Sequence, residues 1–201
     1  MKKLALTDFA KYRYPSALEL SPDGRYLTFA LKEVDREGDG YRWNLWLYDL
    51  ESRESRQITR GDDQRKAVWE DNTHILYKTT ELDEALRARG FEEEWTVYHR
   101  LNVCTGEESE AFRLPMSVSG LWKMDEGRYV FTGETHLDRP NLLELTGQAL
   151  EKELVRRQQT KGYKVLTELP LCENGVGMFN QTRNTLFLYL EDAGEYRRIT
   201  P

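Results

Sequence analysis

The side chains best suited to acid–base or covalent chemistry are few and scattered in this chain. The three histidines are His74, His99 and His136, and each lies in or beside a stretch with strand character. A serine hydrolase would also need a nucleophile elbow, Gly-x-Ser-x-Gly, which the sequence lacks, since Ser119-Gly120 has no glycine two positions before the serine. Without that serine no histidine is a credible triad base, and we interpret all three as strand and loop residues.

Metal and disulfide chemistry has little support in the sequence. Cys104 and Cys172 are the only cysteines, and neither has a second cysteine or a histidine at the spacing of a zinc site. A disulfide between them is not expected in a reducing compartment. We therefore predict no metal and no cofactor.

The amino-acid composition limits the classes of partner and the locations that are expected for this chain. The 201 residues carry a formal net charge of -6, which disfavours nucleic acid because phosphate binding needs a basic patch. The aromatic content of 11% argues against disorder. No run of 18 apolar residues is present, so we predict no membrane span. The apolar run after Lys3 ends at Asp8, too early for a signal peptide, and a cytoplasmic location is expected.

The elements that would have to position any functional residue are strands, and the first group of them is the clearest. The segment SPDGRYLTF at Ser21–Phe29 places a Pro-Asp-Gly turn between two apolar runs, and glycine accepts the positive φ that such a turn needs. The outgoing run alternates in the manner of a strand. A third strand at Asn44–Leu50 and a short fourth at Arg56–Thr59 complete a unit of the size of one propeller blade.

Two further units follow the same order of strands. The second spans about 66–114 and includes a helical turn or two near Glu81–Arg87. The third spans about 118–200, and its segment Asp125–Phe131 repeats the turn-then-strand pattern of Asp23–Phe29 in the first unit. A long insertion, about 136–183, interrupts the third unit, and its residues 148–159 have apolar side chains at helical spacing.

The ends of the units indicate an internal repeat. LWLYDL followed by RQIT, from Leu45 to Thr59, matches LFLYLE followed by RRIT, from Leu186 to Thr200. We predict an all-β chain, a partial β-propeller of about three four-stranded antiparallel blades at 17–59, 66–114 and 118–200, with a short helical insertion in the third. An ordinary antiparallel meander would show the same alternation and turns, and stays open as the alternative fold.

A family resemblance rests on the same residues. SPDGRYLTF at Ser21–Phe29, LWLYDL at Leu45–Leu50 and RQIT at Arg56–Thr59 resemble the first propeller blade of prolyl oligopeptidase-type serine peptidases (the S9 family), especially acylaminoacyl-peptidase-like members. The segment from Tyr163 to Gly177, YKVLTELPLCENGVG, is similar to a stretch in bacterial members, although Leu171 and Cys172 stand where aromatic residues are expected. The Ser-Pro-Asp-Gly element is also shared with TolB-like propellers.

The resemblance implies a function for the chain. Members of the family carry about seven blades and then an α/β-hydrolase domain with the catalytic Ser, Asp and His, so we expect this chain to be the front part of a longer polypeptide. Its role would be non-catalytic: to gate or orient peptide substrates for the hydrolase domain. Glu168, with Asn174 and Asn180, is the candidate for binding the substrate's amino terminus, because an ammonium group needs a counter-charge. The alternative for Glu168 is a solvated loop charge.

A second function class stays open. A TolB-like propeller that binds protein partners would share the blades and need no hydrolase domain. Because three blades cannot close a ring, we also expect apolar blade faces to be exposed and the chain to self-associate. The clusters Glu92–Glu94 and Arg156-Arg157 are interpreted as solvated faces, and the tryptophans as packing between blades.

Overall fold

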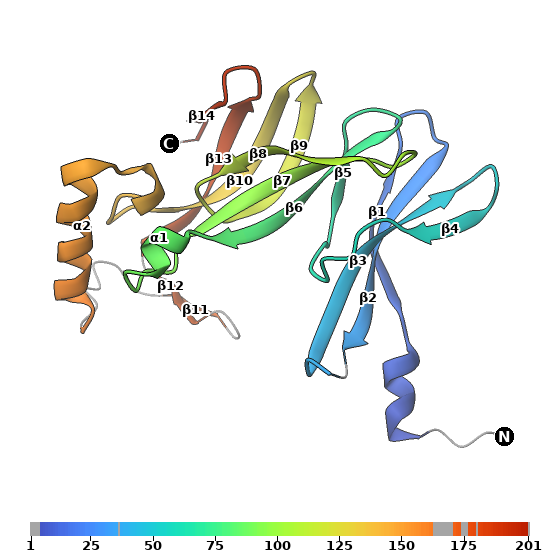
Figure 1. Ribbon diagram of the computed structural model, residues 1–201, viewed down its shortest axis with the longest axis horizontal. Coiled ribbons are helices and arrows are strands. Elements are labelled where there is room, and N and C mark those ends of the chain that lie inside the picture. Colours follow the sequence, from blue (N-terminus) through green and yellow to red (C-terminus); the bar gives the residue numbers. More distant parts are fainter. Residues whose placement is uncertain (1–4, 36, 163–170, 174–176, 180, 201) are drawn as a thin grey trace. The chain divides into compact units, whose positions relative to one another are not determined.

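The structure is a computed structural model that describes residues 5–35, 37–162, 171–173, 177–179 and 181–200. Within these ranges the strands form three four-stranded antiparallel sheets and one two-stranded sheet (Figure 1). Each four-stranded sheet is a meander in which the strands lie in the order in which they follow along the chain. The predicted fold class, all-β with about three four-stranded blades, is confirmed.

The first sheet has the order β1-β2-β3-β4 and follows a short 3-10 helix, η1, at Leu6–Lys11. Its strands are β1 (Tyr14–Leu20), β2 (Tyr26–Asp35), β3 (Gly40–Asp49) and β4 (Glu54–Gln57). The predicted turn lies between β1 and β2, with Gly24 at a φ of 74° and Ser21 Oγ accepting from the backbone N–H of Tyr26 at 2.9 Å. Pro15 lies inside β1, which is compatible with its missing N–H because β1 is an edge strand.

The second sheet has the order β5-β6-β7-β8. Its strands are β5 (Ala67–Trp69), β6 (His74–Leu82), β7 (Glu94–Asn102) and β8 (Glu108–Leu114). One helical turn, α1 (Glu84–Arg87), lies between β6 and β7, where the sequence predicts it. The side chain of Asp83 caps this turn by accepting from the N–H of Leu86.

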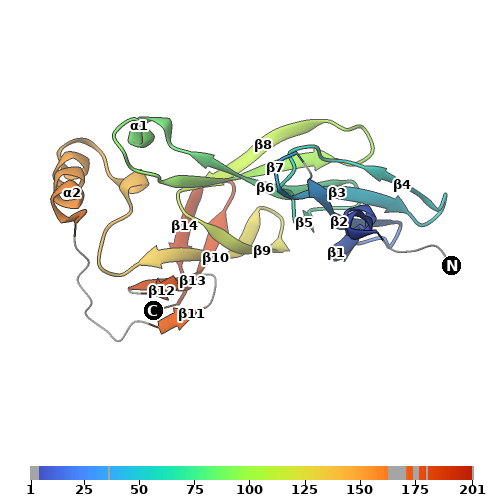
Figure 2. The same cartoon turned by 90° about the horizontal axis from the view of Figure 1, so that it is seen from below.

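The third sheet has the order β14-β13-β10-β9 and contains the insertion. Its strands are β9 (Val118–Asp125), β10 (Arg128–His136), β13 (Thr182–Leu190) and β14 (Glu195–Arg198). Between β10 and β13 lie a 3-10 turn, η2 (Leu142–Glu144), and the helix α2 (Gly147–Thr160). Figure 2 shows α2 followed along the chain by a small hairpin of β11 (Leu171–Glu173) and β12 (Gly177–Phe179), which the sequence does not predict.

The chain divides into two compact units, and each has its own apolar core. Unit 1 comprises residues 1–79 and 97–113, and unit 2 comprises residues 80–96 and 114–201. The core of unit 1 includes Leu45, Leu47, Trp69 and Ile75. A cluster in unit 2 packs Leu86 of α1 and Leu142 of η2 against Leu154 of α2, which explains why the insertion forms a helix with one apolar face.

The tryptophans have different surroundings. Trp69 is buried in the core of unit 1 and donates from Nε1 to the carbonyl of Glu19 at 3.1 Å. Trp43 lies under the guanidinium group of Arg65, which is 4.1 Å from its ring centre. Trp122 is 49% exposed. The interpretation as packing residues therefore describes Trp69 well and Trp122 poorly.

None of the helices in the described ranges has the length and the apolar character that a bilayer crossing needs. In the same ranges, no three His, Cys, Asp or Glu side chains are grouped so that they could hold a metal ion.

Candidate functional site: a glutamate-lined cavity

A cavity of about 440 Å³ lies within unit 2 and is the strongest candidate for a binding site. We refer to it as the glutamate-lined cavity. Its walls come from the start of β7, the link between β8 and β9, the end of β10, the segment before and within η2, and α2, β13 and β14. The lining residues are Glu92–Glu94, Pro115–Ser117, Glu134–His136, Arg139–Asn141, Glu144, Arg157, Phe187, Tyr196 and Arg198.

Arg157 connects three parts of the wall. From α2 its guanidinium group donates to Glu93 at 2.6 Å, to the carbonyl of Pro140 at 2.6 Å and to Glu153 at 3.1 Å. The side chain is only 10% exposed. Its interpretation as part of a solvated face is therefore wrong, because its charge is paired and largely enclosed. Glu153 is itself buried, and hydrogen bonds from Arg156 and Arg157 lower the pKa of its carboxyl against the effect of burial.

The apolar part of the lining is aromatic. Phe187 of β13 stacks on Phe131 of β10, with ring centres 5.0 Å apart, and meets the edge of Tyr196 at 5.7 Å. Met116 packs against Gly133, where an added Cβ would lie 2.4 Å from its sulfur, so a larger residue at this position would require the Met116 side chain to move. The cavity therefore has aromatic and thioether surface beside its charged groups.

The charges of the lining are predominantly negative. Five glutamates and three arginines contribute to it, a formal excess of two negative charges with histidine neutral. Glu144 accepts a hydrogen bond from the hydroxyl of Tyr196. Burial, and then this bond to a carboxylate, raises the pKa of Tyr196. Glu92 and Glu94 accept no hydrogen bond from any residue that the structure describes.

His136 lies at the edge of the cavity with both ring nitrogens engaged. Arg139 donates to Nε2 at 3.0 Å, and Thr182 Oγ1 lies 3.2 Å from Nδ1. Burial and the charge of Arg139 lower the pKa of His136, while Glu134 and Glu93 act in the opposite direction. Because Nε2 accepts from a guanidinium group, the ring is neutral and Nδ1 carries the proton toward Thr182.

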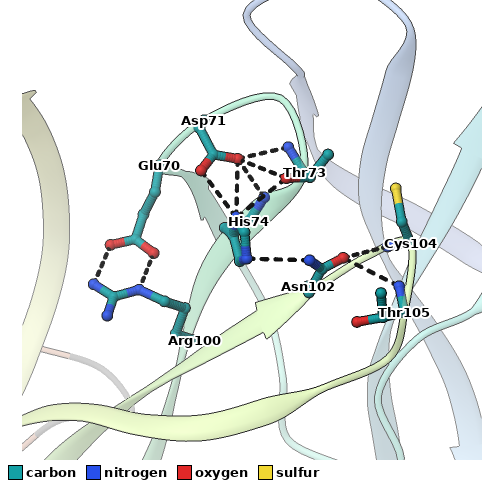
Figure 3. A network of polar contacts seen from close by, with 8 residues as sticks. All are labelled: Glu70, Asp71, Thr73, His74, Arg100, Asn102, Cys104 and Thr105. Atoms are coloured by element: carbon teal, nitrogen blue, oxygen red, sulfur yellow. Dashed lines mark hydrogen bonds and ion pairs between the residues drawn. The ribbon is translucent and has the colours of Figure 1, made fainter.

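A second polar network lies in unit 1 and fixes two turns of the second sheet (Figure 3). His74 Nδ1 is 2.9 Å from Asp71 Oδ2, and Nε2 is 3.1 Å from Asn102 Nδ2. The side-chain oxygen of Asn102 accepts from the backbone N–H groups of Cys104 and Thr105, at 2.9 and 3.1 Å. Asn102 therefore presents its amide nitrogen to His74, and Nε2 of that ring acts as an acceptor.

The same network shifts the acidity of Asp71. Partial burial raises the pKa of its carboxyl, but hydrogen bonds from the N–H groups of Thr73 and His74 and from their side chains outweigh burial and bring the pKa to about 2. Glu70 and Arg100 form a two-point ion pair beside it, at 2.5 and 2.7 Å (Figure 3). These contacts stabilise the β5–β6 turn, a structural role consistent with the interpretation of His74 as a turn residue.

His99 of β7 also has a polar neighbour at each ring nitrogen. Its Nε2 lies 2.9 Å from Thr79 Oγ1, its Nδ1 lies 3.5 Å from Glu108, and its ring stacks on Tyr77 with centres 5.2 Å apart. Each histidine thus has hydrogen-bonding partners and a structural place in its sheet.

The fold has counterparts among solved structures. The acylaminoacyl peptidase of Pyrococcus horikoshii matches 95% of this chain with a TM-score of 0.63 and 12% sequence identity. The isopeptidase AtxE2 matches 94% with a TM-score of 0.54 and 13% identity, and the tricorn protease matches 92% with a TM-score of 0.52 and 8% identity. This chain has the fold of a partial β-propeller.

The match covers only part of each of these proteins. The chain spans 26% of the length of the Pyrococcus peptidase, 30% of AtxE2 and 18% of the tricorn protease. The resemblance to the propeller of acylaminoacyl-peptidase-like proteins is confirmed at the level of the fold. No protein-family model matches the chain, and no curated protein matches it.

The sequence-predicted site residues and the cavity come from different parts of the chain. Glu168, Asn174 and Asn180 all lie outside the described residues, so their role stays a prediction. The glutamate-lined cavity was not predicted from the sequence. One signal was available, since Arg157 lies three residues after Leu154 and four after Glu153, on the face of α2 that packs inward.

Proposed function

We propose that this chain is the non-catalytic propeller portion of a serine peptidase, which gates or orients peptide substrates for an α/β-hydrolase domain on the same polypeptide. The observation that carries the proposal is the match to the Pyrococcus acylaminoacyl peptidase over 95% of this chain and 26% of that one. The nucleophile elbow is absent from these 201 residues, so the catalytic serine would belong to the other domain.

The glutamate-lined cavity supports the orienting role. It combines aromatic surface, at Phe187 and Tyr196, with carboxylates that accept no hydrogen bond from described residues, at Glu92 and Glu94. Apolar surface with a few fixed polar groups is the usual composition of a ligand pocket. The proposal that Glu168, Asn174 and Asn180 bind the amino terminus of the substrate remains part of this function and is to be tested by substitution.

The decisive experiment measures the mass and the reactivity of the native polypeptide from its source. An immunoblot should detect a product of about 70 kDa, the size of a propeller with a hydrolase domain of ordinary length. The same band should be labelled by a fluorophosphonate, which reacts with activated serines. A native product near the 23.7 kDa of this chain, without labelling, would refute the proposal.

A second candidate is a TolB-like propeller that binds protein partners. Exposed leucines on β1 favour it, because Leu18 and Leu20 are both more than half exposed. A native polypeptide that carries further blades, lacks fluorophosphonate labelling and is recovered in a stable complex would support this function in place of the first.

A further inference from the structure

We propose that the glutamate-lined cavity is a subsite for the guanidinium group of an arginine side chain in a peptide. The inference deepens the proposed function and rests on it only in naming a peptide as the molecule that carries the arginine. It specifies which residue of the peptide the cavity selects, and it concerns residues of unit 2 that the structure describes.

The cations already present in the lining are bound by other groups of the protein. Arg157 donates to Glu93, Glu153 and the carbonyl of Pro140, so its guanidinium group is occupied by acceptors of the protein itself. Arg139 donates to His136. These two arginines are therefore held by the wall, and neither is bonded to the carboxylates of Glu92 or Glu94. Arg198, the third arginine of the lining, is likewise engaged in an interaction of its own.

The remaining carboxylates of the lining belong to Glu92, Glu94 and Glu134. Glu92 and Glu94 precede and begin β7, and no described residue hydrogen-bonds to their side chains. Glu134 lies near the end of β10, and among the described residues its basic neighbour is the neutral His136, at 3.8 Å. Among the described residues, these exposed carboxylates near the start of β7 and near the end of β10 are paired with no arginine or lysine, and a cation between them would gain charge-assisted hydrogen bonds.

The composition of the lining favours a guanidinium group over other charged groups. A guanidinium group is planar, stacks on aromatic rings and donates to two carboxylates at once. The ring that the cavity offers is that of the partly exposed Tyr196, because Phe187 is buried against Phe131 and Tyr196. An ammonium group would pair with the carboxylates but has no planar face to stack on an aromatic ring. An anionic side chain would meet a formal excess of negative charge, five glutamates against three arginines.

Binding of capped peptides to the purified protein tests the proposal directly. Isothermal titration calorimetry would compare three peptides, Ac-Gly-X-Gly-NH2, in which X is arginine, citrulline or glutamate. Citrulline keeps the shape of arginine without its charge. We expect the arginine peptide to bind at least about tenfold more tightly than the citrulline peptide and the glutamate peptide to bind most weakly. Equal affinity for arginine and citrulline, or no binding of the arginine peptide, would overturn the proposal.

Matched variants assign the binding to the cavity. Glu94→Gln and Glu134→Gln each remove one charge from the lining and should weaken binding of the arginine peptide by about tenfold. Glu126→Gln makes the same change in the turn before β10, outside the lining, and should leave the affinity unaltered. Circular dichroism confirms that each variant is folded. Equal affinities for all three variants would place the binding elsewhere and reject the cavity.

The peptide titration and the test of the proposed function can fail independently, because peptide binding needs no catalytic serine. Specific arginine binding by a polypeptide that is never labelled by fluorophosphonate would support the subsite and reject the peptidase. Labelling of the native polypeptide, together with equal binding of the arginine and citrulline peptides, would support the peptidase and reject the subsite.

Discussion

The hydroxyl of Thr59 accepts a hydrogen bond from the backbone N–H of Leu45 at 2.8 Å. Thr200 accepts the same bond from Leu186 at 3.2 Å. In both sheets the N–H of the isoleucine before the threonine donates to the carbonyl of the same leucine, at 2.8 Å. The Ile-Thr pair that ends the first and third sequence repeats therefore performs one structural task, which is to close the fourth strand onto the third.

Replacing Thr59 by valine should destabilise the protein. Valine keeps the shape of the side chain but leaves the buried N–H of Leu45 without an acceptor, at an expected cost of about 1–3 kcal/mol in the free energy of unfolding. Thr59→Ser keeps the hydroxyl and should retain most of the stability that the valine variant loses. Urea denaturation of both variants checks this prediction, and equal stability of the valine and serine variants would contradict it.

Removing the charge of Arg157 should release α2 from the wall of the cavity. Arg157→Met leaves Glu93 and the buried Glu153 without this partner, and we expect a loss of about 3 kcal/mol, as for one member of an enclosed ion pair. Arg156→Met is the matched control, because the neighbouring Arg156 also binds Glu153 but is half exposed and should cost less than about 1 kcal/mol.

Hydrogen exchange distinguishes a local from a global effect of the Arg157 substitution. Amides of α2 should exchange faster in Arg157→Met than in Arg156→Met, while amides of β2 and β3 in unit 1 stay protected. If both variants lose the same stability and the same protection, the enclosed position of Arg157 has no special role.

The network around Asp71 predicts a dependence of stability on pH. Its pKa of about 2 in the folded state lies below the ordinary value of an aspartate side chain, so the ionised carboxylate stabilises the fold at neutral pH. This contribution is present in full above about pH 4–5 and is lost as the pH falls toward 2. The stability difference between the wild type and Asp71→Asn should be constant near neutral pH and shrink between pH 4 and 2.

Urea denaturation at several pH values measures this difference for Asp71. Asp192→Asn serves as the control, because the carboxylate of Asp192 accepts no hydrogen bond from a described residue. Its stability difference from the wild type should be small and vary less with pH. A difference for Asp71→Asn that stays constant down to pH 2 would show that the network does not favour the charged form.

Local sequence signals were sufficient to predict the three four-stranded sheets. The turns after β1 and β9 each contain a glycine at positive φ, and Gly24 and Gly127 adopt φ values of 74° and 68° at corresponding places in the first and third sheets. The helix predicted at 148–159 is α2 at 147–160, because its apolar residues recur at helical spacing. These features depend on residues that are close together in the chain.

The cavity could not be predicted because its contacts are distant in the sequence. Arg157 and Glu93 are 64 residues apart, and the charge pattern of either segment alone is also that of a solvated surface. The hairpin β11–β12 was missed because each strand has only three residues, too few for alternation to be recognised. Pairing of distant charges is decided by the tertiary fold, which a single sequence does not reveal.

Exposed apolar residues on β1 predict that the chain self-associates. β1 is an edge strand, and its Leu18 and Leu20 are 60% and 55% exposed. Burying such side chains against a second copy removes apolar surface from water, and the unpaired edge offers backbone partners. Sedimentation should therefore show association that rises with protein concentration. The double variant Leu18→Lys, Leu20→Lys should reduce it, whereas Leu50→Lys, at an exposed turn leucine, should not. A concentration-independent monomer would rule this surface out as an interface between copies.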